Sequence, residues 1–278
     1  MKNFTKKIIL IFSIFIVLGI LSYLMFNQQL SISKYTITNS NIPSDFDNYK
    51  IIQLSDLHYK NFKDHKLSNT IKSEKPNLIV MTGDMIDKNI TDYSNTEELF
   101  KSISTIAPIY CVSGNHEVAS ENIKNTMSAL YNKYNITELN NQSAQIKKGK
   151  SSIILYGLRY TGSKSTVQYN NLLKDRLDPA NTECFSILLN HRSDTFDSIS
   201  EYGYSLVLSG HSHGGIIRIP LLGGLLGNDG TFFPKYDAGA FKKHGSVMIA
   251  SRGLGKSNWI PRTFNRPDIV SITLKYTK

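Results

Sequence analysis

The first pattern along the chain is an unbroken apolar run near its start. Residues 8–26, IILIFSIFIVLGILSYLMF, contain no charged side chain. As an α-helix, such a run reaches roughly 28 Å, close to the roughly 30 Å hydrocarbon core of a bilayer. A core helix of a soluble protein would usually show a polar stripe over this length. The run therefore predicts a transmembrane anchor over residues 8–26.

The residues that flank this run predict its orientation. Lys2, Lys6 and Lys7 precede it, and residues 1–7 contain no acidic side chain. The positive-inside rule places this basic tail in the cytoplasm and the rest of the chain across the membrane. A cleaved signal peptide is the competing interpretation, but its apolar region is usually about 7 to 15 residues long and ends at an Ala-x-Ala-like site. We expect a single-pass anchor in the cell membrane that carries an extracytoplasmic domain.

Beyond the anchor, the pattern changes to short apolar runs. Residues 27–49 are polar and lack sustained apolar periodicity, so we expect a stalk there and the domain itself over residues 50–278. Five runs of strand length follow, at 51–54, 78–81, 109–112, 185–189 and 206–208. Runs of this kind are typical of buried strands. Helical spacing between the first three, as in Leu99, Phe100 and Ile103, indicates crossover units and a largely parallel sheet.

The later part of the chain carries a different arrangement. Residues 152–158, 247–250 and 269–274 have strand patterns without clear helices between them. Strands that follow one another without helices usually pair antiparallel, so these segments predict a second, more antiparallel sheet. Together the two regions predict a layered α/β sandwich.

Composition narrows the class of protein. The chain has 278 residues, with 32 Lys and Arg against 22 Asp and Glu, and a formal net charge of +10. This excludes an acidic disordered tail, and 40% hydrophobic residues suffice for a compact core. A basic surface could bind anionic headgroups or wall polymers, and it is equally common on ordinary soluble proteins.

The two cysteines, Cys111 and Cys184, are too few for a disulfide scaffold, so we expect buried thiols, with a single disulfide as the alternative.

Polar clusters follow each of the five strand-like runs. They read Ser-Asp-Leu-His at 55–58, Thr-Gly-Asp-Met-Ile-Asp at 82–87, Ser-Gly-Asn-His-Glu at 113–117, Asn-His-Arg at 190–192 and Ser-Gly-His-Ser-His at 209–213. Five of the seven histidines lie in these clusters. Ligands collect at the carboxyl ends of parallel strands, so the clusters should converge on one crevice. Carboxylate, imidazole and amide oxygen suit divalent ions such as Mn, Fe or Zn.

The spacing inside two clusters supports metal binding. Asp56 and His58 are two residues apart, as are His211 and His213. In an extended backbone, residues at this spacing point to the same side, so each pair could grip one ion. A single Asp-x-His is more often an ordinary loop pair. Five such clusters in sequence order favour a metal centre.

This series of motifs resembles the calcineurin-like metallophosphoesterase superfamily over residues 51 to about 275. The resemblance implies a four-layer α/β/β/α sandwich of two mixed sheets flanked by helices, with a phosphoesterase centre of two divalent metal ions. It also implies metal ligands: Asp56, His58, Asp84 and His213 for the first ion, and Asp84, Asn115, His191 and His211 for the second, with Asp84 bridging. His116 would be the catalytic histidine that binds no metal, and Asp87 could orient its imidazole and keep it cationic.

A narrower likeness comes from the later motifs. Gly-His-Ser-His-Gly-Gly at 210–215, Ser-Arg-Gly-Leu-Gly at 251–255 and the segment 262–267 are similar to membrane-anchored bacterial phosphoesterases related to UDP-2,3-diacylglucosamine pyrophosphatases. This implies a phosphorylated small-molecule or lipid-linked substrate. Arg192 and Arg252 are candidate phosphate contacts because a guanidinium presents a planar fork of donors, and ordinary surface arginines are the alternative. Residues 216–233, rich in Leu, Phe and Gly, either line an acyl-chain path or pack under their own domain.

Two other functions fit part of the sequence. A non-catalytic envelope-binding module on the same fold would not need Asp87 and His116, which are both present. A nuclease would explain the positive charge, because basic surfaces bind phosphate backbones without sequence preference. The predicted anchor holds the domain away from cytoplasmic nucleic acid and argues against nucleic acid as a partner. The sequence predicts no particular oligomeric state.

Overall fold

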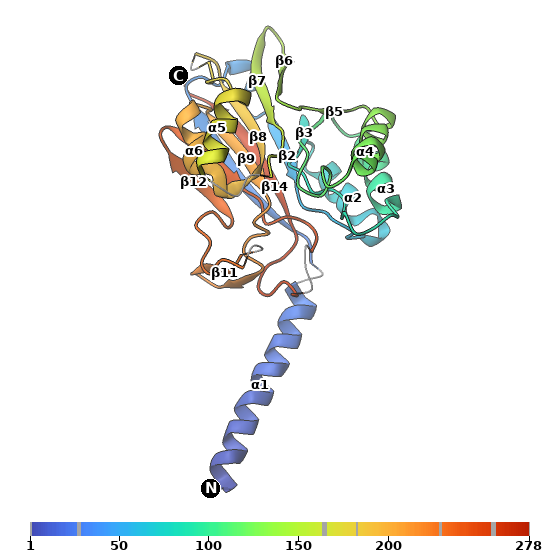
Figure 1. Ribbon diagram of the computed structural model, residues 1–278, viewed down its shortest axis with the longest axis vertical. Coiled ribbons are helices and arrows are strands. Elements are labelled where there is room, and N and C mark those ends of the chain that lie inside the picture. Colours follow the sequence, from blue (N-terminus) through green and yellow to red (C-terminus); the bar gives the residue numbers. More distant parts are fainter. Residues whose placement is uncertain are drawn as a thin grey trace.

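The computed structural model describes residues 2–26, 29–162, 166–181, 183–227, 230–256 and 260–277. The helices are α1 (Lys2–Phe26), α2 (Lys66–Ser73), α3 (Ser94–Ile103), α4 (Glu121–Lys133), α5 (Thr166–Arg176) and α6 (Phe196–Ile199). The strands are β1 (Ser31–Asn39), β2 (Lys50–Leu54), β3 (Leu78–Met81), β4 (Ile109–Cys111), β5 (Ile136–Glu138), β6 (Gln142–Lys148), β7 (Ser151–Leu158), β8 (Ser186–Arg192), β9 (Leu206–Gly210), β10 (Ile217–Ile219), β11 (Gly223–Leu226), β12 (Gly239–Lys243), β13 (Ser246–Ala250) and β14 (Asp268–Tyr276). Figure 1 shows α1 projecting from one end of a layered domain.

The first sheet has the strand order β1-β14-β2-β3-β4-β5, and β2 to β5 run parallel. The apolar runs at 51–54 and 78–81 form β2 and β3, whose side chains are buried because both faces of the sheet are covered. Helices α2, α3 and α4 pack on its outer face, where Ile71, Phe100 and Met127 share one apolar cluster with residues of β2 and β3.

The second sheet has the order β12-β13-β9-β8-β7-β6. Its four central strands are mutually parallel, and only the edge strands β6 and β12 pair antiparallel. The expected antiparallel character is therefore wrong at the centre of the sheet. The segment at 269–274 was also expected here, but it lies in β14 of the first sheet. Helices α5 and α6 cover the outer face through Leu173 and Phe196.

The largest apolar cluster lies between the two sheets. It joins Ile51 and Val80 of the first sheet to Leu155, Ile187 and Leu208 of the second, all of them buried. With helices outside each sheet, three apolar clusters separate four layers. The predicted α/β/β/α sandwich of two mixed sheets flanked by helices is confirmed.

The predicted stalk over residues 27–49 is wrong from residue 31 onward. Strand β1 pairs in parallel with β14 along its whole length, from Ser31 opposite Asp268 to Asn39 opposite Tyr276. The strand was missed because it lies at an edge and carries polar side chains at most positions, which leaves a weak apolar pattern. As a result, only four residues lie between the last residue of α1 and the first residue of the sheet.

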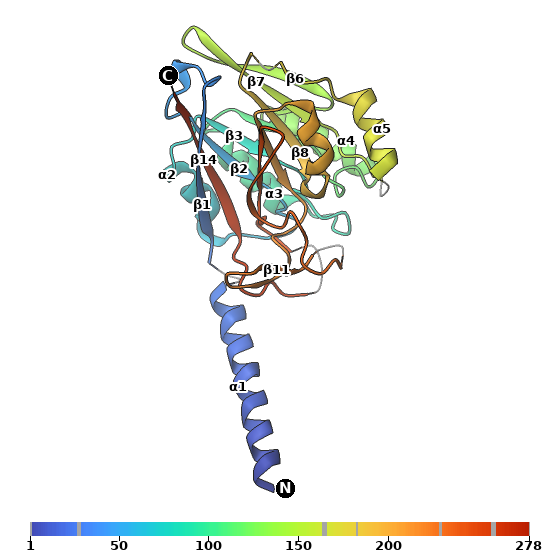
Figure 2. The same cartoon turned by 90° about the vertical axis from the view of Figure 1, so that its left-hand side faces the viewer.

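Helix α1 stands apart from the sandwich in both views (Figures 1 and 2). Among the described residues it is the one helix long and apolar enough to cross a membrane, over Phe4–Leu21, and none of that stretch is buried in the protein. A membrane anchor and a signal sequence both have this form.

The two cysteines do not pair. Cys111 is buried on β4, and Cys184, just before β8, is partly exposed. Burial raises the pKa of the Cys111 thiol well above its usual value. The expected buried thiol is therefore present at Cys111, and the alternative of a single disulfide is wrong.

Candidate metal centre

The five polar clusters meet at one edge of the sandwich. They follow the carboxyl ends of β2, β3 and β4 in the first sheet, and of β8 and β9 in the second. Ligand atoms within 4.8 Å of one another form three groups: Asp56, His58 and His213; His58, Asp84 and His116; and Asp84, His191 and His211. The crevice expected from the sequence therefore brings together titratable side chains from all five clusters, and from both sheets.

The backbone of this crevice is strained at the same residues. Asp56, His58, Asp84, His211 and His213 have φ values of 51°, 51°, 54°, 71° and 51°. Non-glycine residues rarely adopt this left-handed region, and such strain is concentrated at functional sites. Backbone hydrogen bonds from Asp56 to Gly83 and from His58 to Asp84 hold the turn at 56–58 in place.

These left-handed turns change the direction in which the side chains of the two paired motifs point. The expectation of extended backbones is wrong, because both residues of each pair are left-handed. Asp56 and His58 still face one group of donors, but His211 and His213 belong to different groups. The family resemblance likewise implies that His213 belongs with the first ion and His211 with the second.

The first cluster combines Asp56, His58 and His213, all almost fully buried. The Nε2 atoms of His58 and His213 lie 3.2 Å apart, and His213 Nε2 lies 3.5 Å from Asp56 Oδ1. Ligands about 2.1 Å from a metal ion lie roughly 3.0–3.4 Å from one another. The backbone N–H of His211 donates to the Asp56 carboxylate at 3.1 Å and fixes its orientation. The spacing of these donors fits one divalent ion.

The second cluster is organised around His191. Its Nδ1 donates to the carbonyl oxygen of Thr82 at 2.7 Å, so in the neutral ring the lone pair lies on Nε2, which points inward. That Nε2 lies 3.2 Å from Asn115 Oδ1, 3.1 Å from His211 Nδ1 and 3.3 Å from Asp84 Oδ2. These four nitrogen and oxygen atoms lie close together, and a positive charge between them would stabilise the arrangement.

Asp84 lies between the two clusters. Its Oδ1 accepts a hydrogen bond from the backbone N–H of His116 at 2.9 Å. Its Oδ2 then faces both sides, 3.9 Å from His58 Nε2 and 3.3 Å from His191 Nε2. One carboxylate oxygen of Asp84 thus faces donors of both clusters.

Burial sets the charge of the clusters. It lowers the pKa of His58 and of His211 to about 4, and lowers that of His213 well below its usual value. These imidazoles are uncharged at neutral pH and can donate lone pairs to a metal. Burial alone would lower the pKa of His191 as well, but the Asp84 carboxylate raises it to about 10. The protein alone therefore already favours a positive charge beside Asp84.

We expect metal affinity to fall more steeply with acidity once the pH drops below about 6. Burial raises the pKa of Asp56 to about 6, and Asp56 must be ionised to bind a cation, so protons compete with metal below that pH. His58 and His211 stay uncharged until the solution is more acidic. Calorimetric titration with Zn²⁺ should show an affinity that weakens by up to about tenfold per pH unit below about 6. An affinity that is unchanged from pH 7 to pH 5 would contradict this electrostatic picture.

His116 and Asp87 lie beside the centre without forming the expected pair directly. The distance from His116 Nδ1 to Asp87 Oδ1 is 3.6 Å, longer than a hydrogen bond. Nδ1 instead accepts from the backbone N–H of Lys88 at 3.0 Å, which leaves the ring proton on Nε2. His116 Nε2 lies 3.9 Å from Asp84 Oδ2. The imidazole therefore presents an N–H toward the space between the clusters.

The arginines are held by other parts of the protein. Arg192 Nε donates to Asp194 at 3.0 Å, and Arg252 Nη2 donates to Asp268 at 2.9 Å and to Ser31 at 3.0 Å. Arg262, which lies in the segment 262–267, is almost fully buried. Its Nη2 donates to the carbonyl oxygen of Arg252 at 2.7 Å and lies 3.3 Å from His213 Nδ1. A chain of contacts thus runs from the start of β1 to His213 in the first cluster.

Glu117 is the site residue that sequence reasoning missed. Its buried carboxylate accepts hydrogen bonds from the backbone N–H groups of Asp84 at 2.9 Å, Met85 at 2.6 Å and Gly114 at 2.8 Å. It thereby ties together the two loops that carry Asp84 and Asn115. An acid that directly follows the Asn-His pair in a buried turn is the signal that could have identified it.

Replacing Glu117 by Ala should destabilise the fold strongly. The change leaves three backbone N–H groups buried without an acceptor, which should lower the free energy of unfolding by about 3–5 kcal/mol. Urea unfolding followed by circular dichroism measures the loss. The control is Glu121→Ala, because Glu121 is exposed on α4 and pairs with Lys124 at the surface. A loss no larger than that of the control would show that Glu117 does not hold the loops.

Comparison with known proteins gives the family. The calcineurin-like phosphoesterase family matches residues 49–215. An uncharacterized metallophosphoesterase, YkuE of Bacillus subtilis, is 32% identical over 265 residues, covering 90% of this chain and 87% of the relative. Phosphodiesterase YaeI of Escherichia coli is 29% identical, covering 63% of this chain and 64% of the relative. UDP-2,3-diacylglucosamine pyrophosphatase LpxG of Chlamydia trachomatis is 24% identical, covering 80% and 83%.

The fold, the clustered donors and these relatives agree. The family uses two divalent metal ions, and the clusters around Asp84 supply donors for two. The chain therefore belongs to the calcineurin-like phosphoesterase family and is a metal-dependent hydrolase of phosphoester bonds.

Proposed function

We propose that this enzyme is anchored in the cell membrane and hydrolyses a phosphodiester, pyrophosphate or phosphomonoester bond of a lipid-linked or cell-envelope substrate. The observation that carries the proposal is the pair of donor clusters that share Asp84. The proposed ligands are Asp56, His58, Asp84 and His213 for the first ion, and Asp84, Asn115, His191 and His211 for the second.

The protein contributes preorganised donors to this centre. Two divalent ions at these positions supply Lewis acidity toward phosphoryl oxygens and lower the pKa of a water nucleophile. Thr82 holds the ring proton of His191 on Nδ1, and the backbone N–H of His116 holds the carboxylate of Asp84. Both contacts keep the donor atoms pointing inward, so no rearrangement is needed when the substrate arrives.

His116 is proposed to act on the leaving group. When its ring gains a second proton, Nδ1 becomes a donor and Asp87 Oδ1, 3.6 Å away, can accept that proton in a hydrogen bond. The cationic ring then gives its Nε2 proton to the leaving oxygen as the P–O bond breaks, and returns to the neutral form. Asp87 is thus proposed to orient the imidazole and stabilise its charge.

Basic side chains near the centre favour an anionic substrate. Burial and the neighbouring charges of Arg262 and Lys256 lower the pKa of Lys60 to about 8. Three basic side chains therefore lie near one another beside the centre. Arg192 follows the ligand His191, and its charge acts on His211. We propose Arg192 as a phosphate contact. Arg252 is bound to Asp268 and Ser31, and we propose that it mainly positions β1.

A cavity of about 220 Å³ adjoins the second cluster. His211 and Asp194 line it together with Tyr236, Pro234 and Gly227. A cavity of this size beside a phosphoryl centre can hold one organic group of a substrate. The relative from Chlamydia trachomatis is a pyrophosphatase of UDP-2,3-diacylglucosamine, which supports a substrate that carries both a lipid and a phosphate bond.

The proposed topology follows from α1. Lys2, Lys6 and Lys7 would keep the amino terminus in the cytoplasm, and the catalytic domain would then be extracytoplasmic. This location would favour envelope substrates over nucleic acid.

The test is a metal and substrate panel on the full chain in lipid nanodiscs. Turnover of bis(4-nitrophenyl) phosphate should disappear with chelator and return with Mn²⁺ or Zn²⁺. A lipid-linked nucleotide should then give a higher kcat/KM than a lipid phosphate monoester, a soluble nucleotide or single-stranded DNA. Turnover that survives removal of metal would contradict the mechanism, and a preference for DNA would favour the nuclease. Two bound ions without turnover would favour an envelope-binding module.

A further inference from the structure

Exposed apolar side chains gather at one end of the catalytic domain. Leu221 is 105% exposed, Leu222 72%, Phe232 69%, Phe233 61% and Phe264 44%. Outside α1, these are five of the seven large apolar side chains that are exposed among the described residues. We call these five residues the apolar tip. Clustering on this scale differs from the single exposed apolar residues that any protein surface carries.

The apolar tip is held by a defined scaffold. Leu221 and Leu222 lie in the turn between β10 and β11, and Phe232 forms a bridge with Leu226 of β11. At the base of the hairpin, Arg218 forms an ion pair with Asp237 at 2.8 Å, and Asp237 also accepts from the backbone N–H of Gly224 at 2.6 Å. These contacts orient the hairpin so that its apolar residues face away from the protein.

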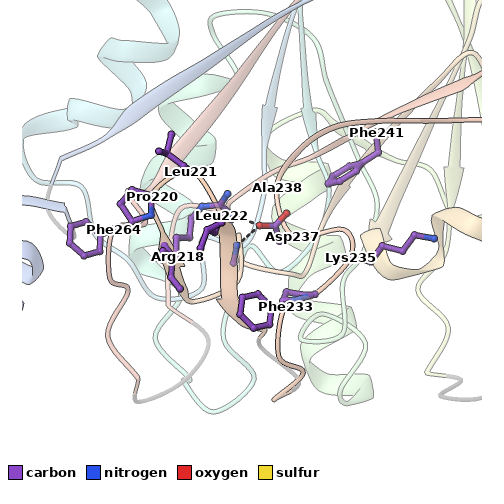
Figure 3. A pocket seen from close by; sticks show the side chains of 14 residues that line it. Arg218, Pro220, Leu221, Leu222, Phe233, Lys235, Asp237, Ala238, Phe241 and Phe264 are labelled. Atoms are coloured by element: carbon purple, nitrogen blue, oxygen red, sulfur yellow. Dashed lines mark hydrogen bonds and ion pairs between the residues drawn. The ribbon is translucent and has the colours of Figure 1, made fainter.

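The tip borders an open groove of about 490 Å³. Figure 3 shows Phe264, Pro220 and Leu221 on one side of it, with the Arg218–Asp237 pair between them and Phe241. Pro234 and Lys235 line this groove and also the smaller cavity beside the metal ligand His211. The apolar end of the domain is therefore continuous with the surface that leads to the centre.

The tip lies at the end of the domain that is joined to α1. The backbone N–H of Ser31, at the start of β1, donates to the carbonyl oxygen of Pro267, three residues after Phe264. Thr263 pairs with Ile217 of β10, so the same segment contacts both β1 and the hairpin. Ser31 is five positions after Phe26, so their Cα atoms lie at most about 17 Å apart. Both views show β11 at the end from which α1 projects (Figures 1 and 2).

We propose that the apolar tip inserts into the surface of the same lipid bilayer that holds α1. The inference rests on the proposed membrane anchoring of α1. A bilayer is the occupant that the geometry favours, because the short link keeps the start of β1, and with it this end of the domain, close to the end of α1. Leucine and phenylalanine on a projecting turn are suited to the boundary between headgroups and acyl chains. Docking there would hold the groove and the metal centre at the lipid surface.

The test measures the depth of labelled positions in the full chain. The protein is reconstituted in nanodiscs of phosphatidylcholine and phosphatidylglycerol, with Cys184→Ser to remove the partly exposed thiol. Single cysteines replace Leu222 in the tip, Ile14 in α1 and Gln145 on β6, which lies at the far end of the domain in both views. Each carries a fluorophore, and lipids with a nitroxide on the acyl chain act as quenchers. Turnover of bis(4-nitrophenyl) phosphate checks that each labelled protein is folded.

We expect strong quenching at positions 14 and 222 and none at position 145. Quenching at position 14 without quenching at position 222 would overturn docking while the anchor stands. Absence of quenching at position 14 would overturn the anchor and docking together. The double variant Phe232→Ser/Phe233→Ser should reduce quenching at position 222 by about half or more. The control is Tyr276→Ser, near the carboxyl terminus at the opposite end of the domain, and it should leave quenching at position 222 unchanged. Equal effects of the two variants on this quenching would contradict the proposal.

Discussion

Replacing Asp84 by Asn should abolish most activity and remove at least one of the two metal ions. Asp84 Oδ2 faces donors of both clusters, and the amide that replaces it carries no charge and bridges cations poorly. Loss of a bridging carboxylate should cost several kcal/mol of transition-state stabilisation, a fall in kcat/KM on the order of 10³-fold or more. The readouts are turnover of bis(4-nitrophenyl) phosphate and metal content by mass spectrometry.

The control for this variant is Asp175→Asn, which removes the same charge from an exposed position on α5. It should keep two ions per chain and the parent rate. If Asp84→Asn also retained two ions and full turnover, Asp84 would not be the shared ligand and the assignment of both clusters would be wrong.

The second large effect is expected for His116→Ala, which should lose turnover but keep both metal ions. His116 presents Nε2 to the centre but is not among the proposed ligands. Loss of a general acid should lower kcat by about 10²–10⁴-fold. The loss should be greatest for substrates with alkoxide leaving groups, because 4-nitrophenolate leaves without protonation. Rates across a series of leaving groups, with metal content for each preparation, measure both parts.

His244→Ala serves as the matched control, because His244 is exposed and its Nδ1 contacts Ser200, which belongs to none of the five polar clusters. A His116→Ala enzyme that lacked one ion would show that His116 is a ligand, in line with its closeness to His58 and Asp84. An enzyme with the parent rate on all leaving groups would show that His116 has no part in the chemistry.

The metal centre was more predictable from the sequence than the arrangement of the sheets. Apolar runs that end in Asp, Asn and His mark both a buried parallel strand and its carboxyl end, so strand position and site position share one signal. The division of His211 and His213 between two clusters was not predictable from the spacing of the motif. It depends on left-handed turns at both residues, which two-residue periodicity does not encode, and it came from the resemblance alone.

The sheet errors have a common physical cause. Strand β1 pairs with β14, more than 200 residues later, and its polar edge position leaves little apolar pattern. The parallel centre of the second sheet depends on α5 and α6, which are short or have few buried positions to mark them as helices. Long-range pairing is decided by packing between layers, and a local pattern of side chains carries little of that information. Glu117 was missed for a related reason, since its role lies in backbone contacts.

A short series of contacts connects the start of β1 to the candidate metal centre. Ser31 at the start of β1 accepts from Arg252, the carbonyl of Arg252 accepts from Arg262, and Arg262 contacts His213. Buried contacts of this kind hold one orientation of the centre relative to the beginning of β1. The position of the membrane would thus determine which way the groove and the metal centre face.

The most direct test of the two-metal centre is a crystal structure of the protein soaked with Mn²⁺, with anomalous scattering used to locate the ions. We predict two anomalous peaks about 3.5–4 Å apart, one beside Asp56 and His213 and the other beside His191 and His211, with Asp84 between them. A single peak, or two peaks without Asp84 between them, would contradict the account.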